Sequence, residues 1–373
     1  MRKVFLAVAA LFSAALVFAA DGVAELVKVV PQGTNVILYV NASRLMKTKF
    51  LDAMCRENTK LGNMVDGVRY HEERLNIPGQ AIKNLLLCRD TSKATASFYL
   101  LNTVVPESQF EEVFVADYAF FVDSRKSSIE FGPRKREVPF FELVRKRTPE
   151  QKYGAVYVGE QESNGNYVVA VVPRDYINDT LEALQSPPVS GEVASVAGGS
   201  MNPEAIAWLV ASLKNKGEAI STWDKMLDGL VFAEVTFDLV GAEEDIEIQA
   251  RFYSDSTLTN GIRTASSAQR FIADLRREKN AWLDSIFDRS NEALRDRVDK
   301  CIQIYPKDGN VILDVKMPAA LYREVCDIAP HVVADLLGMV CEKFQLVEPE
   351  MLGAAEDVQT AAAPSASAAE LFE

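Results

Sequence analysis

The feature that most constrains the fold is a short pattern that recurs along the chain: a β-branched run that follows an Asn residue and precedes a helical stretch. The tetrapeptide Asn-Val-Ile-Leu stands at residues 35–38 and again at 310–313, and Gly165-Asn166 introduces a similar run at 167–172. β-branched residues favour strands, and a recurring order of elements is typical of an internally duplicated protein. The pattern therefore predicts two successive copies of one strand-and-helix unit.

The order of the predicted elements extends this duplication. Hydrophobic periodicity predicts strands at 35–41, 82–88, 95–102, 140–148, 153–159 and 167–172 in the first half, and at 205–212, 230–240, 245–254 and 310–316 in the second. It predicts helices at 43–73, 106–116, 175–185, 218–228, 264–300 and 319–345. Each half then reads approximately strand, helix, strand, strand, helix, strand, helix. We expect an α+β fold of two tandem ferredoxin-like (split βαβ) units with mainly antiparallel sheets and long covering helices.

The helix expected at 264–300 has the clearest amphipathic pattern. Apolar residues recur on it at multiples of three or four positions, at Phe271, Leu275, Trp282, Ile286, Leu294 and Val298. Such a stripe is typical of a helix that packs on a sheet.

The first 20 residues have the order of an export signal. A basic start at Arg2-Lys3 precedes an apolar run over residues 4–20, and Ala19 and Ala20 are small residues suited to a signal peptidase. We expect cleavage there and export to the periplasm or the extracellular space, with an uncleaved N-terminal anchor as the alternative. No later segment is apolar enough to predict a membrane span after signal cleavage.

Composition sets the remaining boundaries. Pro, Ser and Gly between residues 186 and 200 indicate a linker between the halves, and no basic residue follows Lys343. We expect a signal peptide at 1–20, a first α+β unit at 21–190, a second at 191–347, and a disordered acidic Ala/Ser-rich tail at 348–373.

A basic segment interrupts an otherwise acidic chain of formal net charge −13, which disfavours nucleic acid as a partner. The segment could dock an acidic protein, an anionic glycan or the acidic tail of another copy. Alternatively, its charges could protect an edge strand from unwanted pairing. Its residues are Arg125, Lys126, Arg134, Lys135, Arg136, Arg145, Lys146 and Arg147.

Catalytic motifs are missing from the sequence. It has two histidines, His71 and His331, and neither lies in a zinc-protease motif; it has no P-loop, dinucleotide-binding loop or nucleophile elbow. Cys55 or Cys88 could meet His71 in space, and a carboxylate pair could assemble from distant segments. The acidic run 243–245 is expected to form a solvated turn between two strands. We predict no catalytic, cofactor-binding or metal-binding residue and no cofactor.

Five cysteines in an exported chain leave at least one thiol unpaired. Cys55 could bridge Cys88, and Cys301 could bridge Cys326 or Cys341, but we favour buried, unbridged thiols.

Two stretches resemble a loose group of exported bacterial proteins of uncharacterised function. One runs from Val-Pro-Gln-Gly-Thr-Asn at 30–35 into Val-Ile-Leu-Tyr-Val-Asn at 36–41; the other joins Leu-Asn-Ile-Pro at 75–78 to Ile-Lys-Asn-Leu at 82–85. The repeated strand-then-helix units extend this resemblance over most of the chain after the signal. The resemblance implies repeated α+β units and export, and it brings no site residues.

The leading functional hypothesis is an exported, non-enzymatic binding or interaction scaffold of the cell envelope. Two alternatives are an envelope hydrolase whose site assembles only in three dimensions, and a carrier of apolar ligands.

Overall fold

The computed structural model describes residues 26, 27, 30 and 33–328, apart from residues 58, 80, 91–96, 116–120, 134, 146–151, 159–164, 186–191, 200, 214–229 and 255–260. The predicted signal peptide, the predicted tail, the helix expected at 218–228 and the second half of the helix expected at 319–345 lie outside the described residues.

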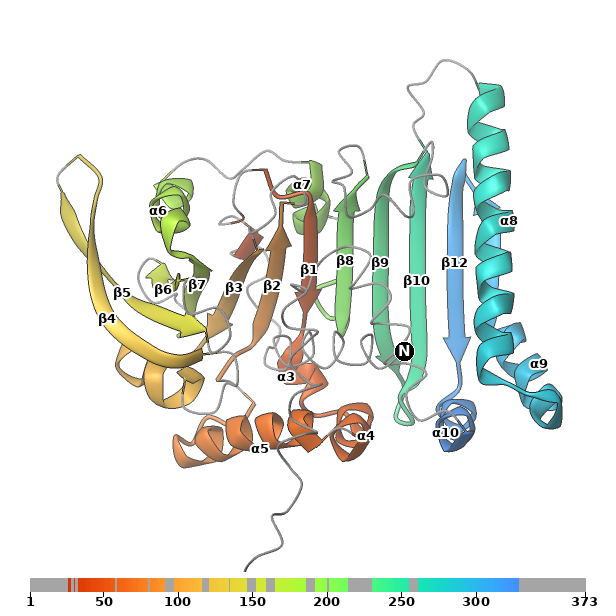
Figure 1. Ribbon diagram of the computed structural model, residues 1–373, viewed down its shortest axis with the longest axis horizontal. Coiled ribbons are helices and arrows are strands. Elements are labelled where there is room, and N and C mark those ends of the chain that lie inside the picture. The colour runs from red at the N-terminus through yellow and green to blue at the C-terminus, as the bar shows by residue number, and fades with distance from the viewer. Residues whose placement is uncertain are drawn as a thin grey trace, which may run out of the picture.

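A single large sheet organises the described part of the chain (Figure 1). Its twelve strands lie in the order β11-β12-β10-β9-β8-β1-β2-β3-β7-β6-β5-β4, and all neighbours are antiparallel. The strands are β1 Val36–Val40, β2 Asn84–Arg89, β3 Ser97–Thr103, β4 Phe121–Phe131, β5 Arg136–Arg145, β6 Lys152–Val158, β7 Tyr167–Pro173, β8 Ala207–Ser212, β9 Leu230–Val240, β10 Asp245–Ser254, β11 Ile302–Lys307 and β12 Asn310–Met317. The α+β class and the antiparallel pairing are as predicted.

Both halves of the chain repeat one strand order within this sheet. β1, β2, β3 and β7 are neighbours in the first half, as are β8, β9, β10 and β12 in the second. In a split βαβ unit another strand separates the two strands that a helix connects, whereas β1 and β2 are direct neighbours here. The prediction of two ferredoxin-like units is therefore not confirmed.

The helices divide between the two faces of the sheet. α3 (Ala42–Leu45), α4 (Lys49–Glu57), α5 (Thr59–Arg74), α8 (Gly261–Ile286), α9 (Glu292–Cys301) and α10 (Ala319–Ile328) pack with one face. α6 (Ile177–Gln185) and α7 (Glu192–Gly199) pack with the other. Strand alternation supplies both cores: Val36 and Val40 point to the first face, and Ile37 and Tyr39 to the second. None of the described helices combines the length and the apolar composition that a bilayer crossing requires.

Short turns complete the described elements. Residues 107–115, predicted as one helix, form a 3₁₀ turn (η1, Glu107–Gln109) and a π-helical turn (η2, Glu111–Val115). Two more 3₁₀ turns are η3 (Arg174–Tyr176) and η5 (Arg289–Asn291).

The helix predicted at 264–300 is two helices. α8 ends at Ile286 and α9 starts at Glu292, and Asp288 between them accepts hydrogen bonds from the Ser290 backbone N–H at 2.9 Å and the Asn291 amide at 3.1 Å. A short acidic side chain that binds nearby N–H groups competes with the helical backbone pattern. The Ser290 hydroxyl also donates a hydrogen bond to this carboxylate at 2.5 Å, and this bond, ahead of those from the N–H groups, holds the pKa of the Asp288 carboxyl below its usual value.

The pairing of β1 with β8 joins the two halves. Val36 to Val40 run antiparallel to Ala211 to Ala207. Across this seam the rings of Tyr39 and Trp208 stack at 4.9 Å, and the Tyr39 hydroxyl lies 2.8 Å from the Pro203 carbonyl oxygen. Both aromatic side chains are fully buried.

Acidic residues at the β9–β10 turn tie helices of both halves to the sheet. The Glu244 carboxylate accepts the backbone N–H groups of Lys49 and Phe50, each at 2.9 Å, and Asp245 accepts that of Ala319 at 2.8 Å. Of the run 243–245, Glu243 and Glu244 lie in the predicted turn, and Asp245 is the first residue of β10. Two of its carboxylates additionally satisfy N–H groups at the starts of α4 and α10, which intrahelical bonds leave unpaired.

We expect Glu244→Ala to lower the free energy of unfolding by about 1–2 kcal/mol, because two helix N–H groups lose their acceptor. Urea denaturation followed by circular dichroism measures the change. Glu243→Ala is the matched control: its exposed carboxylate lies 3.5 Å from Arg323, so its loss should cost no more than about 0.5 kcal/mol. Equal costs for both variants would contradict the capping role.

Candidate functional site

β4 and β11 are the edge strands of the sheet, and each has one side that pairs with no other strand among the described residues. The sequence pattern predicts neither strand. An edge strand exposes a row of N–H and C=O groups that can pair with another chain.

The hairpin of β4 and β5, which we call the arm (residues 121–145), projects from the sheet (Figure 1). β5 pairs with β4 along its whole length but with β6 only over residues 141–144. The outer part of the arm is thus a two-stranded ribbon. Pro139 on β5 lacks an N–H group, which disfavours strand addition on that side. The outer side of β4 has no proline.

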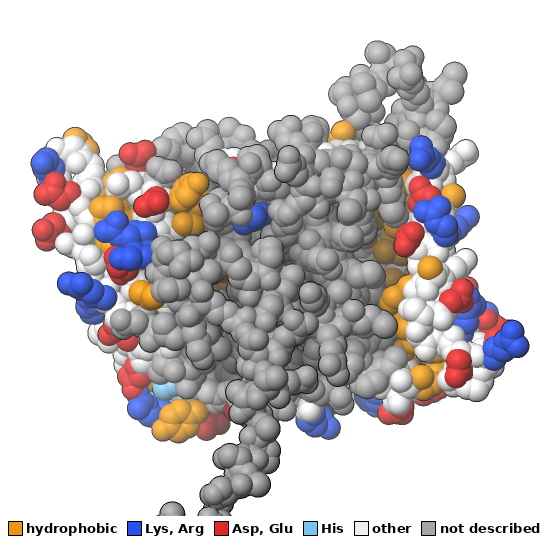
Figure 2. Space-filling model, viewed as in Figure 1, with side chains coloured by type: hydrophobic (Ala, Val, Ile, Leu, Met, Phe, Trp, Pro, Cys, Tyr) orange, Lys and Arg blue, Asp and Glu red, His pale blue; other side chains and the backbone are white. Residues whose placement is uncertain are grey.

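The structure places much of the predicted basic segment on the arm. Arg125, Lys126, Lys135 and Arg136 are exposed there. Arg145 is the last residue of β5, and Arg134, Lys146 and Arg147 lie outside the described residues. Figure 2 shows basic and acidic side chains together at the left end of the molecule, where the arm lies. Of the exposed cations, Arg125 and Lys126 lie on the edge strand β4, whereas Lys135 and Arg136 lie in the turn and at the start of β5.

The cations of the arm have only weak partners within the described structure. Lys126 lies 4.0 Å from Glu107 and 5.2 Å from the centre of the Phe141 ring, and Lys135 lies 3.5 Å from Glu130. Ion pairs this exposed contribute little to stability, so a partner's carboxylates could replace them.

Glu142 marks the inner end of this surface. It accepts hydrogen bonds from Lys152 at 3.0 Å and Arg174 at 3.1 Å. The Lys152 bond and charge, together with those of Arg174, lower the pKa of the Glu142 carboxyl. Lys152 and Arg174 already neutralise the Glu142 carboxylate. Arg125, which lies opposite Glu142 on β4, can therefore pair with other anions.

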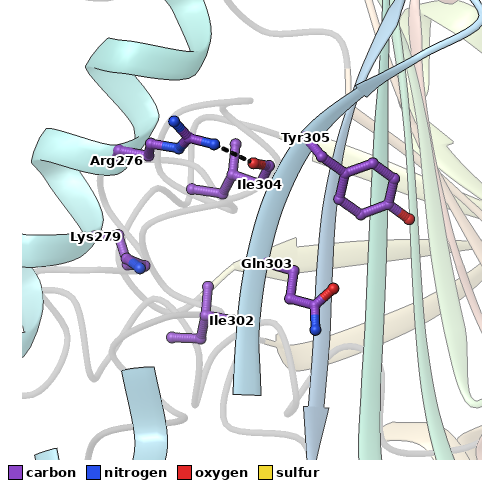
Figure 3. A pocket seen from close by; sticks show the side chains of 6 residues that line it. All are labelled: Arg276, Lys279, Ile302, Gln303, Ile304 and Tyr305. Atoms are coloured by element: carbon purple, nitrogen blue, oxygen red, sulfur yellow. Dashed lines mark hydrogen bonds between the residues drawn. The ribbon is translucent and has the colours of Figure 1, made fainter. Parts of the chain in front are cut away.

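The β11 edge carries a shallow groove of about 490 Å³ (Figure 3). Arg276 and Lys279 reach into it from α8, and Ile302 and Ile304 lean toward them from β11, while Gln303 and Tyr305 point away. The Arg276 guanidinium donates a hydrogen bond to the Ile304 carbonyl oxygen at 2.9 Å. This bond occupies a carbonyl that an added strand would use. The groove combines two cations with an apolar floor.

The structure separates Cys88 from His71, whereas Cys55, the other candidate, lies on α4, which packs against the α5 helix of His71. His71 lies on α5, which packs with the face that also carries α8 to α10, whereas Cys88 is buried in the core on the opposite face. Burial strongly raises the pKa of the Cys88 thiol. Cys55, Cys88 and Cys301 are free thiols, so the Cys55–Cys88 disulfide does not form. His331 and Cys341 lie outside the described residues.

The residues that the structure describes form no candidate metal site. No three His, Cys, Asp or Glu side chains there gather closely enough to hold an ion.

Comparisons with known proteins give only a distant structural likeness. No protein-family model matches the chain, and no curated protein matches it. Among solved structures, crystal form III of TP0453 is 11% identical with a TM-score of 0.41, covering 80% of this chain and 96% of that one. Crystal form I of TP0453 is 9% identical with a TM-score of 0.37, covering 80% and 95%. Likeness at this level supports no inference about function.

Cys55 provides a test of the cysteine environment. Burial, ahead of the nearby charges, raises the pKa of its thiol to about 11. Thiolate is the reactive form, so at pH 8 only about one Cys55 in a thousand should be ionised. We expect slow alkylation by iodoacetamide, with a rate that rises with pH to a midpoint near 11. Mass spectrometry of the Cys55 peptide measures the rate, and the urea-unfolded chain is the control. A midpoint near 9 in the folded chain would contradict the burial.

Proposed function

We propose that the protein is a non-enzymatic binding scaffold that acts outside the cytoplasm and docks an extended acidic segment of a partner protein on its arm. One observation carries this proposal: β4 combines a free sheet edge with exposed cations on a chain of net charge −13. Export rests on the basic and apolar order of the first 20 residues.

Backbone geometry supports an extended partner. β4 is an edge strand of 11 residues that pairs with β5 alone among the described strands. A peptide that adds to such an edge gains main-chain hydrogen bonds, and its alternate side chains contact the surface on each side. The arm offers Lys126 on one side, and Arg125 with the half-buried Ile129 on the other.

Charge supports an acidic partner. Four exposed cations lie on the arm, with Glu130 and Glu137 as exposed anions beside them. The acidic remainder of the chain repels long polyanions such as nucleic acid, whereas a short acidic segment can contact the arm alone. A peptide therefore fits this surface better than a polyanion does.

We further propose that the two halves descend from one duplicated unit. The shared order of β1-β2-β3-β7 and β8-β9-β10-β12, each set followed by a helix, supports this. The scaffold would then consist of two related units, at residues 21–190 and 191–347, whose central strands merged into one sheet. The first unit alone carries the arm.

The test is the binding of a fluorescent 12-residue peptide of alternating Glu and Thr, measured by anisotropy. We expect the combined variant Arg125→Gln, Lys126→Gln, Lys135→Gln and Arg136→Gln to bind it at least about tenfold more weakly, because several ion pairs are lost together. N-methylation of alternate peptide bonds should also abolish binding, since strand addition needs the peptide N–H groups.

The matched control removes four exposed cations elsewhere, in the variant Arg289→Gln, Lys300→Gln, Lys316→Gln and Arg323→Gln. Its net charge equals that of the arm variant, and it should bind the peptide like the unmodified chain. Equal losses in both variants would show a general charge effect and overturn the proposal. Tighter binding of a heparin fragment than of the peptide would indicate an anionic glycan instead.

A further inference from the structure

The groove at the β11 edge has a chemistry that the arm lacks. Its floor is apolar, formed by Ile304, which is 7% exposed, and the half-buried Ile302. Arg276 and Lys279 stand beside this floor, one helical turn apart on α8. At about 490 Å³ the groove is large enough for a few side chains.

The two cations are not equally available. Lys279 pairs with Asp299 at 2.7 Å. Among the described residues, the Arg276 guanidinium is bound to the Ile304 carbonyl oxygen rather than to a carboxylate. A guanidinium has five N–H donors, so Arg276 can bind a carboxylate while keeping or exchanging this bond. The groove therefore suits a short segment that has large apolar side chains next to acidic ones.

A segment near the end of the chain has that composition. Residues 370–373 read Glu-Leu-Phe-Glu, and they follow a stretch of mainly small residues at 361–369. Leu371 and Phe372 are apolar, like the isoleucine floor of the groove. Glu370 and Glu373 are opposite in charge to Arg276 and Lys279. These two large apolar residues are flanked directly by acids.

The chain can bring this segment to the groove of its own molecule. α10 ends at Ile328 and packs against α9 and β10, and β10 is two strands from β11. The 41 residues from 329 to 369 can span roughly 140 Å when extended, whereas two strand spacings cover only about 10 Å. A tether of this kind gives a high effective concentration. The arm is the more distant of the two basic surfaces, because nine strand spacings, about 43 Å, separate β10 from β4.

We propose that the groove between α8 and β11 is the docking site for residues 370–373 of the same chain. Leu371 and Phe372 cover Ile302 and Ile304, and the flanking glutamates pair with Arg276 and Lys279. The docked segment covers the edge of β11 and closes it to other chains. This inference does not depend on the function proposed for the arm.

The first experiment uses full-length chains and a fluorescent peptide of residues 364–373. The unmodified chain should bind the peptide weakly, because its own segment occupies the groove. The tail variant Leu371→Ser, Phe372→Ser should bind it at least about tenfold more tightly, since its groove is vacant. Adding Arg276→Gln and Lys279→Gln to the tail variant should remove that gain, whereas adding Arg289→Gln and Lys300→Gln should not. If the tail variant binds the peptide equally well with and without the Arg276 and Lys279 substitutions, the proposal is overturned.

Hydrogen exchange at β11 is the second measurement. The two chains that it compares differ only at residues 371 and 372, so the sequence of the sheet itself is unchanged. Backbone amides of residues 302–305 and 307 should exchange faster in the tail variant than in the unmodified chain, at every protein concentration. If the exchange rates of the two chains differ only at high protein concentration, the segment docks on a second copy of the chain. That result would overturn docking within one molecule. Equal exchange in both chains would show that the segment does not cover β11.

Discussion

The backbone pairing of β1 with β8 is the interaction on which the rest of the structure depends. It joins the halves through Val36–Val40 and Ala207–Ser212, which are almost completely buried. Strands on both sides satisfy the N–H and C=O groups of these central strands, and side chains cover both faces. Among the described strands, β4 and β11 alone lack a neighbour on one side, so these are the two edges at which a further strand could be added to this sheet.

The two edges differ in how they are protected. At β11 the Arg276 side chain satisfies the Ile304 carbonyl oxygen, and α8 lies alongside. At β4 the protection comes from charge, since Arg125 and Lys126 are exposed on the strand. Cations at both edges also disfavour pairing of one copy's β4 with another copy's β11, because like charges would be brought together. Acidic segments do not meet this repulsion, and so the same feature that limits self-association favours acidic ligands.

Sequence patterns predict a strand when both of its faces, or one full face, are buried. β1 and β12 share the run Val-Ile-Leu and are found where predicted. β4 reads Phe-Val-Asp-Ser-Arg-Lys-Ser-Ser-Ile-Glu-Phe and β11 contains a proline, because an edge strand need not be apolar throughout. The basic residues of the arm could therefore be found from charge alone, without their strand. The groove could not be found, since Arg276 and Ile304 meet only through tertiary packing.

The groove exists because the chain reverses direction at Asp288. A single helix over 264–300 would carry residue 300 about 21 Å beyond Ile286, at 1.5 Å per residue, and β11 could not return along α8. Asp288 has an extended backbone and caps the start of η5, which begins a new helical segment after α8, and α9 then packs back toward β11 and β12. This return places Ile302 and Ile304 opposite Arg276 and Lys279. A local capping preference, invisible in the apolar stripe of the helix, thus determines which cations face the edge of the sheet.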